Sequence, residues 1–150
     1  MNAINMLHDL KKDLERTFGS FRFENQDAKI SFYLQNEPRV IGGSEEAELE
    51  PMQVIKLING SKNEESSKAN VIIVIQCKNE EENQQGWIDV QNQIDRIMLR
   101  FSENPIFAGK YEVNKISWAL AEDNPYPISL GGVELEIELP NIEKEGIEFG

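Results

Sequence analysis

Between residues 133 and 139, apolar and acidic residues alternate without a fault. The apolar positions are Val133, Leu135, Ile137 and Leu139, and the acidic positions are Glu134, Glu136 and Glu138. A period of two predicts a β-strand with one buried face and one carboxylate face. Burial of the four apolar side chains contributes at most about 6–12 kcal/mol. The carboxylate row fits an ordinary wet face, a contact between subunits, or a sheet edge that its charges keep from pairing.

Two stretches carry the three- and four-residue spacing of amphipathic helices. In residues 2–18 the apolar positions are Ile4, Leu7, Leu10, Leu14 and Phe18. The second helix is predicted from Trp87 to about Ser102, before Asn104-Pro105. Its apolar stripe is Trp87, Val90, Ile94, Ile97, Met98 and Phe101, and the positions predicted to face water are Asp89, Gln93, Asp95 and Arg96.

Four further segments are predicted to be strands: Lys29–Gln35, Met52–Ile58, Val71–Cys77 and Tyr111–Ala121. The run at 71–77 is continuously apolar, which favours a central strand covered on both faces. Segments 52–58 and 71–77 form a hairpin in this interpretation, with Asn59-Gly60 as a turn signal. The alternation changes parity within 111–121, which predicts a β-bulge near Asn114.

The order of elements is helix, three strands, helix, two strands. We therefore predict an α+β fold: a single mixed or largely antiparallel sheet of about five strands, with both helices packed on one face. The chain is expected to be one domain, 1–150, with an N-terminal helix within 1–18 and an acidic C-terminal tail at 141–150. Trp87 and Trp118 are in phase with apolar positions and are expected in the core. The glycine pair Gly131-Gly132 is expected to permit a tight turn.

The charge balance narrows the classes of partner. The chain has 27 acidic and 15 basic residues, a formal net charge of −12. Such a surface repels nucleic acid and anionic lipid, so specific binding to either is not expected. Cys77 is the single cysteine and lies in an apolar run, so it is expected to be a small core residue without a disulfide. No signal peptide or membrane-spanning run is recognised, which favours a cytoplasmic site of synthesis and folding.

No residue pattern predicts catalysis, a cofactor or a metal. His8 is the single histidine and has no recognisable nucleophile as partner. The acidic stretches at 45–50 and 80–82 lack the spacing of a calcium loop, so solvated loops are the better interpretation. Five glutamates in the segments 42–51 and 60–69 are candidates for contacts with a partner or for the lining of a channel: Glu45, Glu46, Glu48, Glu64 and Glu65.

Several motifs in the second half of the chain resemble those of a known family. They are the segment Asn83–Val90 that leads into a helix, Tyr111–Glu122 with Trp118-Ala119-Leu120, Pro125-Tyr126-Pro127, and Gly131-Gly132 followed by the strand to Pro140. Together they are similar to the tail terminator and tail completion proteins of phages and prophages of Gram-positive bacteria. The resemblance covers about residues 45–145.

This resemblance implies a structural role without enzymatic activity. Members of the family form a ring, usually of six copies, that caps the tail tube and joins it to the neck or head. The implied partners are further copies of this chain, the tail tube protein, and sheath or neck proteins. The implied location is a virion or phage tail-like particle that assembles in the bacterial cytoplasm. The net charge also fits an alternative, an acidic regulatory or inhibitory module that binds a basic protein surface.

Overall fold

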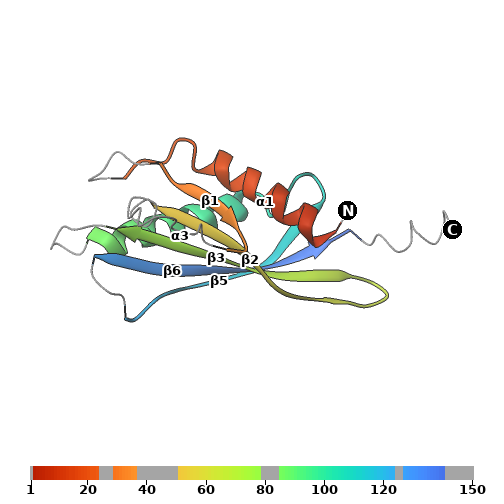
Figure 1. Ribbon diagram of the computed structural model, residues 1–150. Helices are drawn as coiled ribbons and strands as arrows, with labels where there is room; N and C mark the ends of the chain where they lie inside the picture. The colour runs from red at the N-terminus through yellow and green to blue at the C-terminus, as the bar shows by residue number, and fades with distance from the viewer. Residues whose placement is uncertain (1, 24–28, 37–50, 79–84, 124–126, 141–150) are drawn as a thin grey trace, which may run out of the picture.

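The computed structural model describes residues 2–23, 29–36, 51–78, 85–123 and 127–140, and these form two helices and one six-stranded mixed sheet (Figure 1). The α+β prediction is therefore confirmed, with one strand more than expected. The elements are α1 (Ala3–Thr17), β1 (Ser31–Leu34), β2 (Met52–Lys62), β3 (Ser67–Lys78), α3 (Gln85–Glu103), β4 (Ile106–Phe107), β5 (Tyr111–Leu120) and β6 (Ile128–Leu139).

The strands lie in the order β1-β2-β3-β6-β5-β4, and only β1 and β2 are parallel. The last two long strands, β5 and β6, pair antiparallel. The suggestion that 133–139 forms a sheet edge is wrong, because β6 lies between β3 and β5. The additional strand, β4, has only two residues and pairs with the start of β5, which is too short to leave a periodic signal.

The hairpin of β2 and β3 is confirmed, but its turn is not at Asn59-Gly60. That dipeptide lies inside β2, just after a register irregularity between Leu57 and Asn59. Gly60 is needed there because a Cβ would lie 2.9 Å from the carbonyl oxygen of Lys68 on the opposite strand. The chain reverses at residues 63–66, where the Asn63 side chain accepts hydrogen bonds from two backbone amides of the turn, each 2.8 Å long. β6 accompanies β3 as far as Ser67, so only the turn of the hairpin extends past the paired strands.

The predicted bulge in β5 is confirmed by a register shift between Val113 and Lys115 in its pairing with β6. A bulge inserts one residue on one strand, so it reverses the in–out alternation that follows. The parity change in the sequence therefore predicted the position of the bulge correctly.

Both helices pack on the same face of the sheet and share one hydrophobic core. α1 begins after Asn2, whose side chain accepts a hydrogen bond from the Asn5 amide, 2.9 Å long. Phe18, just after α1, contacts Phe32 of β1, with ring centroids 6.0 Å apart. On β3 the fully buried residues alternate with half-buried ones: Val71, Ile73, Ile75 and Cys77 against Ile72, Val74, Gln76 and Lys78. The predicted central position of this strand is confirmed, because β3 lies between β2 and β6, but only one of its faces is fully buried and the other is half-buried.

The Gly131-Gly132 pair lies inside β6 and does not form a turn. A Cβ on Gly131 would lie 2.7 Å from Val90 Cγ1 of α3 and 3.2 Å from the carbonyl oxygen of Ala119. A Cβ on Gly132 would point to the opposite face, 3.3 Å from the tip of Ile72. Gly131 thus permits α3 to approach the sheet closely, and this requirement replaces the predicted turn.

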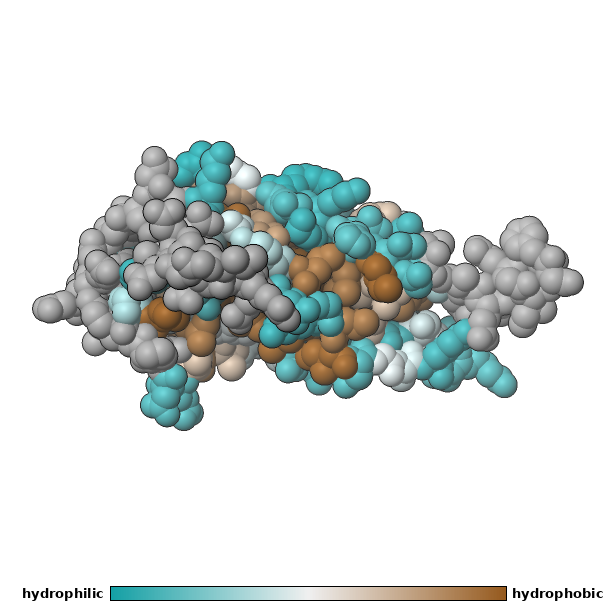
Figure 2. Space-filling model, viewed as in Figure 1, coloured by the Kyte–Doolittle hydropathy of each residue, from teal (hydrophilic) through white to brown (hydrophobic). Residues whose placement is uncertain are grey.

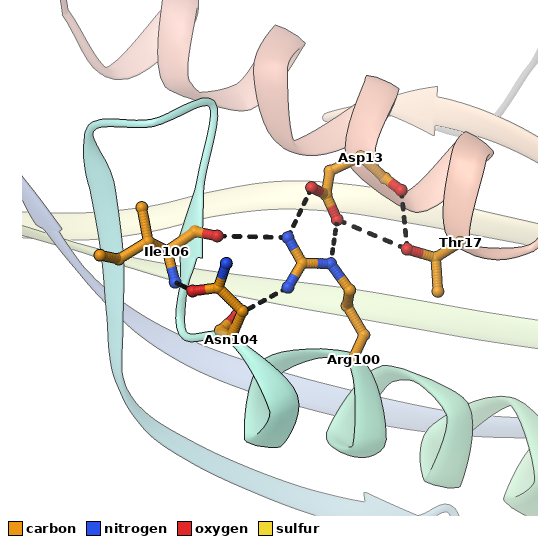
Figure 3. Close-up of polar contacts among 5 residues, drawn as sticks. All are labelled: Asp13, Thr17, Arg100, Asn104 and Ile106. Carbon is orange, nitrogen blue, oxygen red and sulfur yellow. Dashed lines mark hydrogen bonds and ion pairs between the residues drawn. The ribbon is translucent and has the colours of Figure 1, made fainter.

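An ion pair joins the two helices (Figure 3). Arg100 of α3 donates two hydrogen bonds to the carboxylate of Asp13 on α1, at 2.9 and 2.8 Å. The same guanidinium donates to the carbonyl oxygens of Asn104 and Ile106, at 2.6 and 3.3 Å. Only 7% of the Asp13 side chain and 21% of the Arg100 side chain are exposed. This fork therefore ties α1, α3 and the start of β4 together.

We predict that Gly131→Ala destabilises the protein by about 1–3 kcal/mol, because neither the β-branched Val90 nor the Ala119 backbone can yield cheaply. Gly132→Ala is the matched control and is expected to be close to neutral, since the flexible tip of Ile72 can move. Urea unfolding of both variants measures the difference. Equal stabilities would contradict the close-packing explanation of Gly131.

We also predict that Arg100→Met destabilises the fold by about 3–5 kcal/mol, because it leaves the buried Asp13 carboxylate without its cation. The double variant Asp13→Leu with Arg100→Met removes both charges and should recover much of that loss. Urea unfolding midpoints test the pair. A double variant as unstable as the single one would show that packing of the Arg100 stem, and not the charge pair, is decisive.

Candidate functional site

The sheet has a second face, opposite α1 and α3, on which no helix of the described residues lies. We call it the helix-free face. The register of the strands places in one row across it Val54, Val74, Gly132 and Ala119, and in the next row Lys56, Ile72, Glu134 and Ser117. Burial decreases across the face, from the buried Val54 on β2 through the half-buried Val74 on β3 to the exposed Ala119 on β5.

A hollow of about 510 Å³ lies on the β5 side of this face. Its lining is mainly apolar and includes Ile72, Val74, Ala119, Leu130 and Gly132. The absence of a side chain at Gly132 contributes to the depth of its floor. Figure 2 shows from one side that hydrophobic side chains also reach the surface across the middle of the molecule, bordered by hydrophilic ones.

The carboxylate row Glu134, Glu136 and Glu138 lies on the helix-free face, beside the hollow. Its nearest cations come from its own sheet. Lys68 of β3 lies 3.7 Å from Glu136, and Lys115 of β5 is opposite the same glutamate. Glu112 of β5 is opposite Glu138 and adds another carboxylate. The hypothesis that a neighbouring subunit contacts the row stays a prediction, and any such contact would meet a surface already partly neutralised around Glu136.

The other predicted contact residues are in two places. Glu64 and Glu65 are exposed at the tip of the β2–β3 hairpin, where the Asn63 side chain holds the Glu65 amide. The candidates Glu45, Glu46 and Glu48 lie outside the described residues. The row on β6 runs toward the hairpin tip, because Glu138 is opposite Lys68, two residues after the turn at 63–66.

Both tryptophans were predicted to lie in the core, and both are 45% exposed. Trp118 is opposite Val133, so its side chain is on the helix-bearing side as its phase indicated. It is exposed because β5 is the outer strand there and the helical cover ends before it. Trp87 lies in the first turn of α3, at the margin of a buried stripe that continues through Val90, Ile94 and Ile97.

Asp89 and Gln93 were predicted to face water and are buried, with exposed fractions of 1% and 0%. They belong to a chain of polar side chains between α3 and the sheet. Gln85 donates to Asp89, Gln53 of β2 donates to the Gln93 carbonyl, and the Gln93 amide donates to the Cys77 sulfur, at 3.0, 2.9 and 2.9 Å. Sequence reasoning missed this network because it assigned the polar residues Asp89 and Gln93 to the solvent-facing side of the helix. In the structure they lie on the buried side of α3, beside Val90 and Ile94. A clear signal would have been the spacing of four between Gln85, Asp89 and Gln93.

Cys77 is buried, as predicted. Burial raises the pKa of its thiol to about 12, and the charge of Asp89 acts in the same direction, whereas the hydrogen bond from Gln93 lowers the pKa. A thiol with this pKa is protonated at neutral pH and is a poor nucleophile. The network therefore joins α3 to β2 and β3 and does not activate the sulfur.

We predict that Cys77 in the folded protein does not react with a thiol reagent at pH 8, where about one thiol in ten thousand is ionised. Labelling in urea should be rapid. Stability should also fall as the pH rises above about 9, because the unfolded thiol then loses its proton and the folded thiol keeps it up to about pH 12. Cys77→Ala should reduce that slope. Fast labelling without urea would contradict the burial of the sulfur.

Clusters of metal-ligating side chains and helices that could span a membrane are two further features to consider among the described residues. Among them no group of three His, Cys, Asp or Glu side chains could hold a metal ion, and His8 is exposed on α1. None of the described helices is long and apolar enough to cross a membrane. Neither a scan against protein-family models nor a search of the curated proteins finds a match to this chain.

Proposed function

We propose that this chain is a structural protein of a phage-type tail, a tail terminator that assembles as a ring on the tail tube and joins the tube to the neck or head. The sequence motifs at 83–90, 111–122 and 125–140 are the origin of the proposal. The observation that carries it is the helix-free face. Such a face, with an apolar hollow beside a row of charges, has the composition of a protein–protein contact.

The arrangement of polar groups also favours binding over catalysis. The buried polar side chains of α3 are amides and one carboxylate that hydrogen-bond to each other and to a protonated thiol. The carboxylates of the row, exposed at Glu134 and half-buried at Glu136 and Glu138, lie on an interior strand of the sheet, where the pairing fixes their spacing. Fixed spacing is what a repeated contact between identical subunits requires.

The net charge of −12 agrees with this role. A ring through which DNA passes must not retain the phosphate backbone, and acidic surfaces repel it. The acidic tip of the β2–β3 hairpin, with Glu64 and Glu65, is exposed at one end of the sheet and so suits a channel or a tube contact (Figure 1).

We predict that the triple variant Glu134→Lys, Glu136→Lys and Glu138→Lys stays folded and loses ring assembly and binding to tail tubes. The physical reason is reversal of the charges that a neighbouring surface would complement. Native mass spectrometry measures the ring, and co-sedimentation with assembled tube protein measures binding. Circular dichroism checks the fold, and the milder Glu→Gln triple variant gives an intermediate result if the charges act directly.

The matched control is Glu15→Lys, Asp95→Lys and Glu103→Lys, which makes the same change in net charge with three exposed residues of the two helices. It should assemble like the parent protein. Normal assembly of the β6 variant would exclude the row as a contact. A parent chain that neither forms rings nor binds tubes, but captures one basic soluble protein, would favour the alternative of an acidic inhibitory module.

A further inference from the structure

The outer side of β5 is an edge of the six-stranded sheet over most of its length. β4 pairs only with Tyr111 and Glu112, so from Lys115 onward no described strand lies beyond β5. The amide of Ala121 donates to the carbonyl of Leu130 on β6, at 3.0 Å. Because backbone groups alternate in direction along a strand, the peptide groups of Ile116, Trp118 and Leu120 point away from β6, toward this edge.

This edge lacks the usual protection against pairing. Exposed edge strands are normally interrupted by charges, prolines or bulges. Here Ile116–Ala121 contains no charge and no proline, and the bulge lies before it, at Val113–Lys115. Trp118 is 45% exposed in the middle of the segment, and the hollow of the helix-free face continues up to the same edge. The composition is that of a strand that pairs with another strand.

The charges that flank the segment indicate which strand. Lys115 precedes it, and Glu122 and Asp123 follow it. A second copy aligned antiparallel brings the lysine of each chain beside the acidic end of the other. A parallel alignment brings lysine to lysine and acid to acid, which is unfavourable. The edge is therefore complementary to itself in the antiparallel direction.

We propose that β5 pairs with β5 of a second copy of this chain, antiparallel and about a twofold axis at Trp118. This is the register that pairs all three outward-facing residues, Trp118 with Trp118 and Ile116 with Leu120, and so satisfies three peptide groups on each chain. The two tryptophans become direct cross-strand neighbours on the helix-bearing side. β4 and the preceding Pro105 cover β5 only as far as Val113, so the second strand fits beyond them.

This pairing does not rest on the proposed function. It uses the edge of β5, whereas the proposed ring contact uses the carboxylate row on β6. It yields a closed dimer with an isologous interface, which differs in mass from any ring. The two proposals can therefore fail independently.

Sedimentation equilibrium of the full chain tests the pairing. We expect a reversible monomer–dimer equilibrium as the first step of association, with any ring appearing as a separate, heavier species. Lys115→Glu or Asp123→Lys alone should weaken dimerisation about tenfold, since each change acts twice across the twofold axis. The two changes together should restore it. Trp118→Ala should weaken the dimer, while Trp87→Ala, a change at an equally exposed tryptophan on α3, should leave it intact.

The register is tested by cross-linking under mild oxidation. Trp118→Cys should give a disulfide-linked dimer, because paired Cα atoms lie about 5.5 Å apart. Leu120→Cys should not, because its two copies would be about 14 Å apart along the strands. A chain that stays monomeric at millimolar concentration overturns the proposal. So does a failure of the double charge variant to recover, a cross-link at Leu120→Cys but not at Trp118→Cys, or a dimer indifferent to Trp118→Ala.

Discussion

The ion pair between Asp13 and Arg100 is a largely buried polar link between α1 and α3. The two helices share one hydrophobic core on one side of the sheet, and the other side has no described helix to cover it. The same guanidinium contacts the carbonyl oxygens of Asn104 and Ile106 and so positions β4. β4 pairs with the first two residues of β5, and the carbonyl of Pro105 accepts a hydrogen bond from the Val113 amide. The helix-free face and the edge of β5 are thus the surfaces that the two helices and this short strand leave uncovered among the described residues.

Periodicity predicted what depends on near neighbours in the sequence. The alternation in 133–139 identified β6 and its carboxylate face, and the parity change in 111–121 identified the bulge at Val113–Lys115. The glycines were misinterpreted because glycine is used both in tight turns and where another segment approaches the backbone closely. Gly60 and Gly131 are glycine because Lys68 and Val90 approach them closely. That requirement comes from a partner strand and a partner helix, and no local pattern distinguishes it from a turn.

The direction in which a side chain points does not by itself determine its burial, because burial also depends on what packs over that position. Trp118 has the phase of a core residue, yet β5 is an outer strand and nothing described covers its indole fully. Asp89 and Gln93 have polar side chains, yet they lie on the stripe of α3 that faces β2 and β3, where Gln53 and Cys77 are their partners. The order of the strands in the sheet is likewise not evident from the local sequence pattern. The sequence indicated a carboxylate row on 134–138, but only the position of β6 between β3 and β5 explains why Lys68 and Lys115 lie beside it.

The acidic charge and the two candidate contacts act together in setting which assemblies can form. Two copies that each carry −12 repel one another over the screening distance of about 10 Å at 0.1 M salt, so unspecific association is suppressed. At shorter distances, the complementarity of the two contacting surfaces determines whether they associate. The flanks of β5 offer a lysine opposite two acids, whereas the row on β6 offers mainly carboxylates around one engaged lysine. The edge of β5 therefore suits an identical strand, and the row on β6 suits a surface richer in cations than itself. An assembly that uses both must meet the row with a different part of the chain or with a different protein, and that requirement is what a ring contact or a tube contact would supply.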